Sequence, residues 1–286
     1  MTADATAMAP PERRPPFRSR VSRAILPIFT GVVVAYLFLP ILVMAVFGFN
    51  DIEGRFNFTW QGFTLDHWAN LFNRYPALNE SLRNSLTVAL ISTVVATTLG
   101  TLIGLALTRY DFRGRGPLNL LIFLPIATPE IVLGASLLAL FVSSGVSRDL
   151  TTITIAHIMF NISFVVVTVR ARIAGFDRHL EEAAMDLGAD EWTTFRKVTF
   201  PLIFPGILAA ALLAFALSID DFVITQFTAG QTITFPLWVY GASRIGVPPQ
   251  VNVMGTLIFL IAMVGIVLWV LLQRRDAAVA ASPLKR

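Results

Sequence analysis

The sequence predicts an all-α integral membrane protein with six transmembrane helices. Three observations support this fold class. The 286 residues are 55% hydrophobic and only 14% charged, with a mean hydropathy of +0.70, whereas soluble domains average about 25% charged residues. Six apolar stretches approach or exceed the roughly 20 residues that a bilayer-spanning helix needs. The basic residues are concentrated in alternate connections between these stretches, as membrane orientation requires.

The six apolar stretches follow a basic tail, residues 1–23, rich in Pro, Ala and Arg, which we expect to be disordered. The first stretch is longer than the apolar part of a secretory signal, and no small-residue cleavage site follows it, so we expect an uncleaved helix. The predicted spans are Ala24–Phe49, Ser85–Thr108, Pro117–Val142, Thr151–Val169, Pro201–Gln226 and Val251–Gln273.

Two regions in the first half of the chain differ from a simple loop and a simple span, namely the segment 50–80 and the third predicted span. The extracytoplasmic segment 50–80 carries Trp60, Trp68 and several Phe residues, which is typical of an aromatic anchor at the membrane interface. In the third span, two prolines and Gly134 predict either a simple bend or a locally broken helix, which lipid tolerates where the loosened backbone faces protein or water.

The distribution of basic residues predicts the topology. The expected cytoplasmic segments hold 17 of the 22 Lys and Arg residues, and they are the N-terminal tail, 109–116, 170–200 and the C-terminal tail 274–286. The positive-inside rule therefore places both termini in the cytoplasm. Because the basic residues flank apolar segments, the net charge of +4 is no indication of nucleic-acid binding.

The connection 170–200 is the most patterned polar part of the chain. Leu180, Ala184 and Leu187 lie at helical spacing on one face, and Gly188 permits a sharp turn after them. Pro201 suits the first turn of the next membrane helix. These features predict a compact pair of short helices that a partner can grip. They also fit an ordinary amphipathic connector lying on the membrane surface.

This connection resembles the EAA loop of binding-protein-dependent ABC importer permeases, whose pattern is E-A-A, three residues, G, nine residues, I-x-L-P. The matching residues are Glu182, Ala183, Ala184, Gly188 and the run Val198-Thr199-Phe200-Pro201, with Val for Ile and Phe for Leu. The run Ser218–Ile224 is similar to the S-x-D-D-F-V-I stretch of the polyamine branch. Nearly all of the chain after the tail is similar to the second permease subunit of spermidine/putrescine importers.

The resemblance implies the type I importer permease (MetI-like) fold in a bacterial cytoplasmic (inner) membrane. Residues 81–273 would form a five-helix core containing the coupling loop 180–201. The implied partners are two ABC ATPase subunits, a second permease subunit and an extracytoplasmic solute-binding protein, besides membrane lipids. The implied coupling residues are Glu182, Ala183, Ala184, Leu187, Gly188 and Pro201. The resemblance also implies that ATP-Mg binds to the partner ATPase, and we expect this chain to hold no cofactor.

Three carboxylates fall within predicted spans: Glu130, Asp220 and Asp221. Charges at membrane depth are costly and usually face a bundle interior or a wet cavity. We expect Asp220 or Asp221 to line a substrate pathway beside the aromatic Phe222, with internal pairing or helix capping as the alternative. Glu130 either faces the pathway or holds the broken span together.

Two polar residues of the fourth span, His157 and Asn161, lie one turn apart. Interhelical hydrogen bonding is their expected role, with substrate contact as the alternative.

Several other functions are disfavoured by what the sequence lacks. It has no Cys, only three His and no pair at metal-ligand spacing. It contains no phosphate-binding G-x-x-x-x-G-K-[ST] loop and no hydrolase motif, so we expect no catalytic residues. An ion-coupled secondary transporter is an alternative, although no internal repeat supports it. Within the resembled family, the substrate alternatives to a polyamine are other amines, phosphonates, opines and ferric ion.

Overall fold

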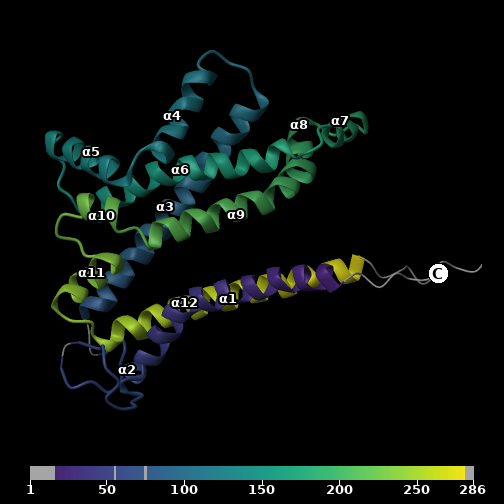
Figure 1. The fold of residues 1–286 in the computed structure, drawn as a ribbon. Coiled ribbons are helices and arrows are strands. Elements are labelled where there is room, and N and C mark those ends of the chain that lie inside the picture. Colours follow the sequence, from purple (N-terminus) through teal and green to yellow (C-terminus); the bar gives the residue numbers. More distant parts are fainter. Residues whose placement is uncertain (1–16, 55, 74–75, 281–286) are drawn as a thin grey trace, which may run out of the picture. The chain divides into compact units, whose positions relative to one another are not determined.

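The computed structural model describes residues 17–54, 56–73 and 76–280, and these residues form helices and connecting loops (Figure 1). No strand occurs in this part of the chain, which contains only two isolated β-bridges. The elements are α1 (Phe17–Phe47), α2 (Asp66–Ala69), α3 (Pro76–Arg109), α4 (Arg115–Ala127), α5 (Glu130–Ser143), α6 (Leu150–Ala174), α7 (His179–Asp186), α8 (Glu191–Thr194), the π-helical turn η1 (Phe195–Thr199), α9 (Phe200–Ile219), α10 (Val223–Thr228), α11 (Phe235–Ile245) and α12 (Pro249–Ala280).

Helices occupy all six positions where membrane spans are predicted. Within the described residues, four stretches are individually long and apolar enough to cross a bilayer, namely Ile25–Phe47, Pro76–Arg109, Leu150–Ala174 and Glu191–Ile219. The third predicted span corresponds to the pair α4 and α5, and the sixth lies in α12, whose described apolar part is the shorter stretch Pro249–Gly265. The all-helical membrane architecture is therefore confirmed.

At the chain ends, helix replaces part of what was expected to be tail. Helix α1 begins at Phe17, before the predicted span start at Ala24, and α12 continues to Ala280. The rest of the predicted disordered N-terminal tail, residues 1–16, and the last residues of the C-terminal tail, 281–286, lie outside the described part of the chain.

The chain divides into two compact units. One unit combines residues 1–71 with 247–286, and the other is residues 72–246. The second unit therefore contains α3 to α11, whereas the expected core, 81–273, also included the last membrane helix.

In the second unit, α3, α6 and α9 pack together as a bundle. Small residues bring α3 close to α6, since a methyl group added at Gly100 would lie 2.6 Å from a side-chain carbon of Val165. A buried apolar cluster joins α6 to α9 and consists of Val165, Val169, Ile173, Ile203, Ala210 and Ala214. The loops at either end of α9 extend from this packed bundle.

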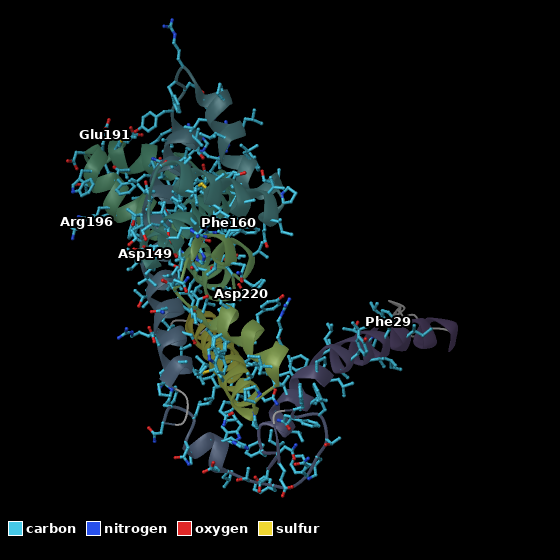
Figure 2. The ribbon with its side chains drawn as sticks, turned by 90° about the vertical axis from the view of Figure 1, so that its left-hand side faces the viewer. Phe29, Asp149, Phe160, Glu191, Arg196 and Asp220 are labelled. Atoms are coloured by element: carbon cyan, nitrogen blue, oxygen red, sulfur yellow. The ribbon has the colours of Figure 1, made fainter. Side chains whose placement is uncertain are left out.

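In the first unit, α1 and α12 lie side by side, with the rings of Phe38 and Phe259 packed edge-on. The side chain of Phe29 on α1 points outward (Figure 2). Asn50 organises the loop after α1, because its amide nitrogen donates to Asn57 Oδ1 at 2.6 Å and its oxygen accepts from the Gln61 backbone at 2.7 Å. Trp60 is half exposed there, as expected of an interfacial aromatic segment.

The third predicted span is broken, not simply bent. Helices α4 and α5 meet at 108° across Thr128 and Pro129. Pro129 adopts an extended ψ of 133° at the N-cap of α5, and as a proline it cannot donate the backbone hydrogen bond that would continue α4. The prediction of a locally broken helix is confirmed, and Glu130 becomes the first residue of α5.

The fifth predicted span, Pro201–Gln226, agrees with the start of α9 (Phe200–Ile219) but is wrong at its end. The continuous helical stretch runs from Glu191 to Ile219, and the chain then breaks before α10. Pro201 lies in the first turn of α9, as predicted, but α8 and η1 continue the helix back to Glu191, nearly three turns earlier. Proline lacks an N–H and its ring clashes with the carbonyl four residues earlier, and the helix widens just before it, where the Phe200 N–H bonds to the Phe195 carbonyl.

Candidate functional site

The connection 175–200 folds as a short helix, a turn and the start of a long helix. Helix α7 ends at Asp186, and Gly188 follows with φ of +90°, a left-handed conformation that favours glycine. The Gly188 N–H donates to the Met185 carbonyl at 2.9 Å. Asp190 then begins α8 by accepting a hydrogen bond from the Thr193 N–H at 3.0 Å. Hydrogen bonding from Thr193 also lowers the pKa of Asp190.

The predicted coupling residues are mostly exposed on this loop. Glu182 and Ala183 are exposed, Ala184 is half-buried, and Leu187 is 90% exposed just after α7. No residue of α7 is fully buried. Two further apolar side chains of α7, Leu180 and Met185, are exposed as well. Pro201 is set apart from these residues, within α9.

One residue of this loop turns inward, and sequence reasoning missed it. The side chain of Glu181 is only 13% exposed and forms an ion pair with Arg109, the last residue of α3. Its carboxylate also accepts a hydrogen bond from the hydroxyl of Thr199 in η1. The adjacent acidic pair Glu181–Glu182 was a usable signal, since neighbouring helical residues point about 100° apart and only one of them can face the bundle.

A smaller polar pair lies at the entry to α7. The ring of His179 contacts the Asp177 carboxylate at 2.6 Å, and the His179 backbone N–H donates to the same carboxylate at 3.0 Å. These hydrogen bonds lower the pKa of Asp177 and raise the pKa of His179. Both groups are largely exposed, so the pair contributes little to stability.

The other end of α9 carries the two neighbouring aspartates, and they differ in environment. Asp220 is exposed at the C-cap of α9. The Asp221 side chain is 9% exposed and points into the bundle. Figure 2 shows Asp220 well apart from Glu191 and Arg196, which precede α9. The break after Ile219 thus separates two carboxylates that a continuous helix would have kept on adjacent faces.

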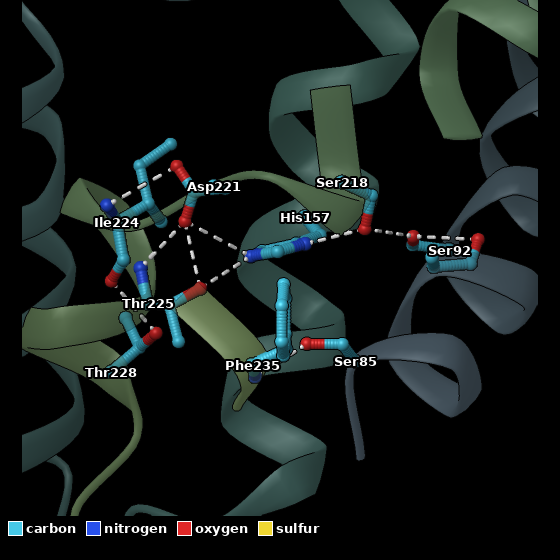
Figure 3. Close-up of polar contacts among 10 residues, drawn as sticks. Ser85, Ser92, His157, Ser218, Asp221, Ile224, Thr225, Thr228 and Phe235 are labelled. Carbon is cyan, nitrogen blue, oxygen red and sulfur yellow. Dashed lines mark hydrogen bonds and ion pairs between the residues drawn. The ribbon is translucent and has the colours of Figure 1, made fainter. Parts of the chain in front are cut away.

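Asp221 belongs to a buried polar cluster that joins four helices, α3, α6, α9 and α10 (Figure 3). One of its oxygens lies 3.3 Å from His157 Nε2 on α6 and accepts from the N–H and hydroxyl of Thr225 at 2.8 and 2.7 Å. His157 Nδ1 lies 2.6 Å from the Ser218 hydroxyl, which in turn lies 3.1 Å from the Ser92 hydroxyl on α3. Asp221 therefore pairs internally, which was the alternative to a role in the substrate pathway.

The cluster also decides between the two interpretations of the polar residues on α6. His157 bonds to Ser218 and Thr225, so its interhelical role is confirmed. Asn161 is fully buried, and neither of its amide atoms has a hydrogen-bond partner among the described residues. The expected interhelical bond of Asn161 is therefore not present.

Phe222 lines a cavity of about 460 Å³ between α5, α10 and α11. Its ring packs against that of Tyr240, with centroids 4.6 Å apart, and the guanidinium of Arg244 lies over the Tyr240 ring at 4.7 Å. Ile131, the neighbour of Glu130, lines the same cavity, whereas Glu130 itself is exposed at the N-terminus of α5. A helix N-terminus favours a carboxylate electrostatically.

The described residues contain no group of three or more His, Asp or Glu placed to hold a metal ion. The combination found here is a bundle of apolar helices, an exposed loop with a glycine turn and polar groups buried between helices. It defines the class of the protein as a helical membrane protein with an exposed polar loop between two of its long helices.

Comparison with known proteins agrees with this class. Residues 96–276 match the family described as "Binding-protein-dependent transport system inner membrane component". The chain is 38% identical over 247 residues to the spermidine/putrescine transport system permease protein PotC of Escherichia coli K12, covering 86% of this chain and 92% of that protein. It is 35% identical over 249 residues to PotC of Haemophilus influenzae, covering 87% and 96%. Against the putrescine permease protein PotI of Escherichia coli K12 the identity is 35% over 250 residues, covering 84% and 88%.

Solved structures show the same fold at low sequence identity. A chain of a bacterial ABC transporter involved in the import of the acidic polysaccharide alginate superimposes with a TM-score of 0.64 at 16% identity, covering 91% of this chain and 98% of that one. A chain of the alginate transporter in complex with a pentasaccharide-bound periplasmic protein gives a TM-score of 0.62 at 17% identity, covering 86% and 91%.

The chain belongs to the family of inner membrane components of binding-protein-dependent transport systems. It is a permease subunit of an ABC importer, with the type I (MetI-like) fold expected from its loop motif.

Proposed function

We propose that this permease forms half of the translocation pathway for a polyamine, spermidine or putrescine. The observation that carries the proposal is the 38% identity to a spermidine/putrescine permease over 247 residues, which spans the loop at each end of α9. The accompanying partners would be two ABC ATPases, a second permease subunit and an extracytoplasmic solute-binding protein. Both termini would lie in the cytoplasm, in keeping with the excess of basic residues in the two tails and in the connections 109–116 and 170–200.

In this proposal the ATPase docks on the exposed face around Gly188. Glu182, Ala183, Ala184 and Leu187 would supply the contacts, since small and apolar groups allow close approach and the carboxylate can pair with a partner's basic residue. ATP-Mg would bind to the ATPase, and hydrolysis there would drive this non-catalytic subunit. Closure of the ATPase dimer would move α7 and switch the membrane helices between inward-open and outward-open arrangements.

On the substrate side, Asp220 is the carboxylate we assign to the pathway. It is exposed, whereas Asp221 already has partners in the buried cluster. A carboxylate on the route lowers the desolvation cost of an ammonium group without enclosing it. Phe222 and Glu130 are secondary candidates. The Tyr240 ring beside Phe222 is already covered by Arg244, so that aromatic pair is a poorer site for a second cation.

The test is ATP-driven uptake of labelled spermidine by the reconstituted complex in proteoliposomes supplied with the binding protein. We expect uptake that requires ATP, and a reduction of about tenfold for Asp220→Asn. Glu53→Gln, a change at another exposed carboxylate outside the bundle, is the matched control and should transport normally. Failure to transport any polyamine would reject the substrate assignment, and normal uptake by Asp220→Asn would reject the pathway role of Asp220.

The ATPase assignment has its own test, a pull-down of the tagged chain from mild detergent. We expect an ATPase and a second permease to co-purify with the wild-type chain, and the ATPase to be lost from Gly188→Arg. An absence of ATPase in the wild-type preparation would reject the docking role of this loop.

A further inference from the structure

The contacts of Glu181 suggest how movement of the docking loop reaches the membrane helices. Helix α7 has no fully buried residue, so apolar packing does not fix it firmly to the bundle. Among the charged side chains of this helix, that of Glu181 is turned inward, being 13% exposed. Its neighbour Glu182 is exposed. The two adjacent carboxylates therefore face different surroundings, one toward the bundle and one toward solvent.

The Glu181 carboxylate joins three separate elements. A single oxygen, Oε1, accepts from the guanidinium of Arg109 at the end of α3 and from the hydroxyl of Thr199 in η1. Thr199 is fully buried at the turn that leads directly into α9. A second contact supports the first, because Arg178 donates to the carbonyl of Thr108 at 3.2 Å, next to Arg109. Charge-assisted bonds of this kind are shorter and stronger than neutral ones and keep their partners in register.

The receiving segment is also unusual. η1 is a π-helical turn held by the bond from the Phe200 N–H to the Phe195 carbonyl. Turns of this type are rare and are found frequently at functional sites. A displacement of the Thr199 side chain would therefore reach η1, the π-helical turn in the stretch from Glu191 to Ile219.

We infer that Glu181 is a positioning residue that transmits movement of α7 to α3 and α9 through Arg109 and Thr199. This rests on the proposed docking of an ATPase on α7 and identifies the connection that such docking would use. Glu182 would bind the ATPase, and Glu181 would transmit the movement of α7 to α3 and α9. Loss of Glu181 should therefore separate ATP hydrolysis from transport while leaving the complex assembled.

The experiment measures ATP hydrolysis and substrate uptake in the same proteoliposomes containing the full complex. For Glu181→Gln we expect normal recovery of the ATPase subunits, retained hydrolysis, and uptake per ATP reduced about tenfold, since residues that carry coupling contribute on this scale. The pair Arg109→Glu with Glu181→Arg should restore much of the uptake. Glu182→Gln should instead reduce ATPase recovery, and Asp186→Asn, an exposed carboxylate on the same helix, should behave as wild type.

Thr199→Val removes one of the two bonds at nearly constant volume, so it tests the link if Glu181→Gln assembles poorly. We expect an intermediate loss of uptake per ATP. Unchanged uptake per ATP in both Glu181→Gln and Thr199→Val would overturn the inference, as would a charge-swapped pair no better than the single variants. If the wild-type chain recovers no ATPase, the proposed function fails, and that result is distinct from an assembled complex in which Glu181→Gln remains coupled.

Discussion

The two ends of α9 place polar residues in opposite environments. Before α9, the loop around Gly188 exposes Glu182 and Leu187. After α9, the chain breaks at Asp220, and Asp221 joins a cluster buried between α3, α6, α9 and α10 (Figure 3). In Figure 1, α7 and α8 lie at one end of α9 and α10 at the other.

The difference separates two uses of polarity in a membrane protein. Exposed groups with few internal partners are free to bind another protein. A buried polar group without a partner costs about 1–3 kcal/mol. Asp221 and His157 have internal partners, whereas Asn161 has none among the described residues. Motif residues alone do not reveal this, since Asp220 and Asp221 are adjacent in one motif and yet belong to different environments.

The largest effect should come from removing the buried carboxylate. Asp221→Ala leaves His157 and the Thr225 N–H and hydroxyl without their acceptor, and we expect it to destabilise the protein by about 3 kcal/mol. The measurement is the midpoint of thermal unfolding in detergent. Asp220→Ala, at the exposed neighbour, should stay within about 0.5 kcal/mol of the wild type. Equal shifts of the unfolding midpoint in the two variants would show that Asp220 and Asp221 do not differ in their contribution to stability.

A smaller effect is expected at the exposed turn. Gly188 has φ of +90° with open space around it, so Gly188→Ala adds backbone strain of about 1–2 kcal/mol without a steric clash. We expect weaker recovery of the partner ATPase and a fall in the unfolding midpoint smaller than that of Asp221→Ala. Gly116→Ala is the matched control, because Gly116 also has open space but lies within α4. If both variants recover the ATPase as the wild type does, the turn is not needed for docking.

The smallest effect should be the titration of the exposed pair at the entry to α7. The Asp177 carboxylate raises the pKa of His179, and Asp177 has a lowered pKa. The stabilisation due to His179 is therefore present below its ordinary pKa of about 6.5 and is lost as the pH rises through its folded value. That due to Asp177 is present above its ordinary pKa of about 3.9 and is lost as the pH falls through its folded value.

The chain contains only three histidines, so His179 can be followed by nuclear magnetic resonance of selectively labelled protein in detergent. We expect a pKa above the ordinary value that returns toward it in Asp177→Asn. The unfolding midpoint should hardly change in this variant, because the pair is exposed. An unchanged His179 pKa in Asp177→Asn would show that the pair does not form in solution.

Much of this molecule follows from local sequence. Apolar runs about as long as a bilayer is thick must form helices, because lipid offers no partner for backbone N–H and carbonyl groups. Pro129 predicted the break in the third span, since it cannot continue α4. Gly188 marked the turn after α7 because a left-handed backbone conformation favours glycine.

The tertiary structure decided which polar residues are free and which are paired. The pattern of α7 does not show that Glu181 faces Arg109 and Thr199, because these residues lie on elements far apart in the sequence. The extent of the fifth span was mispredicted for a related reason, since hydropathy does not reveal the π-helical turn before Pro201 or the break after Ile219. Hydrophobicity and turn chemistry are local properties and can be read along the chain, whereas pairing between carboxylates and their partners depends on how the helices pack.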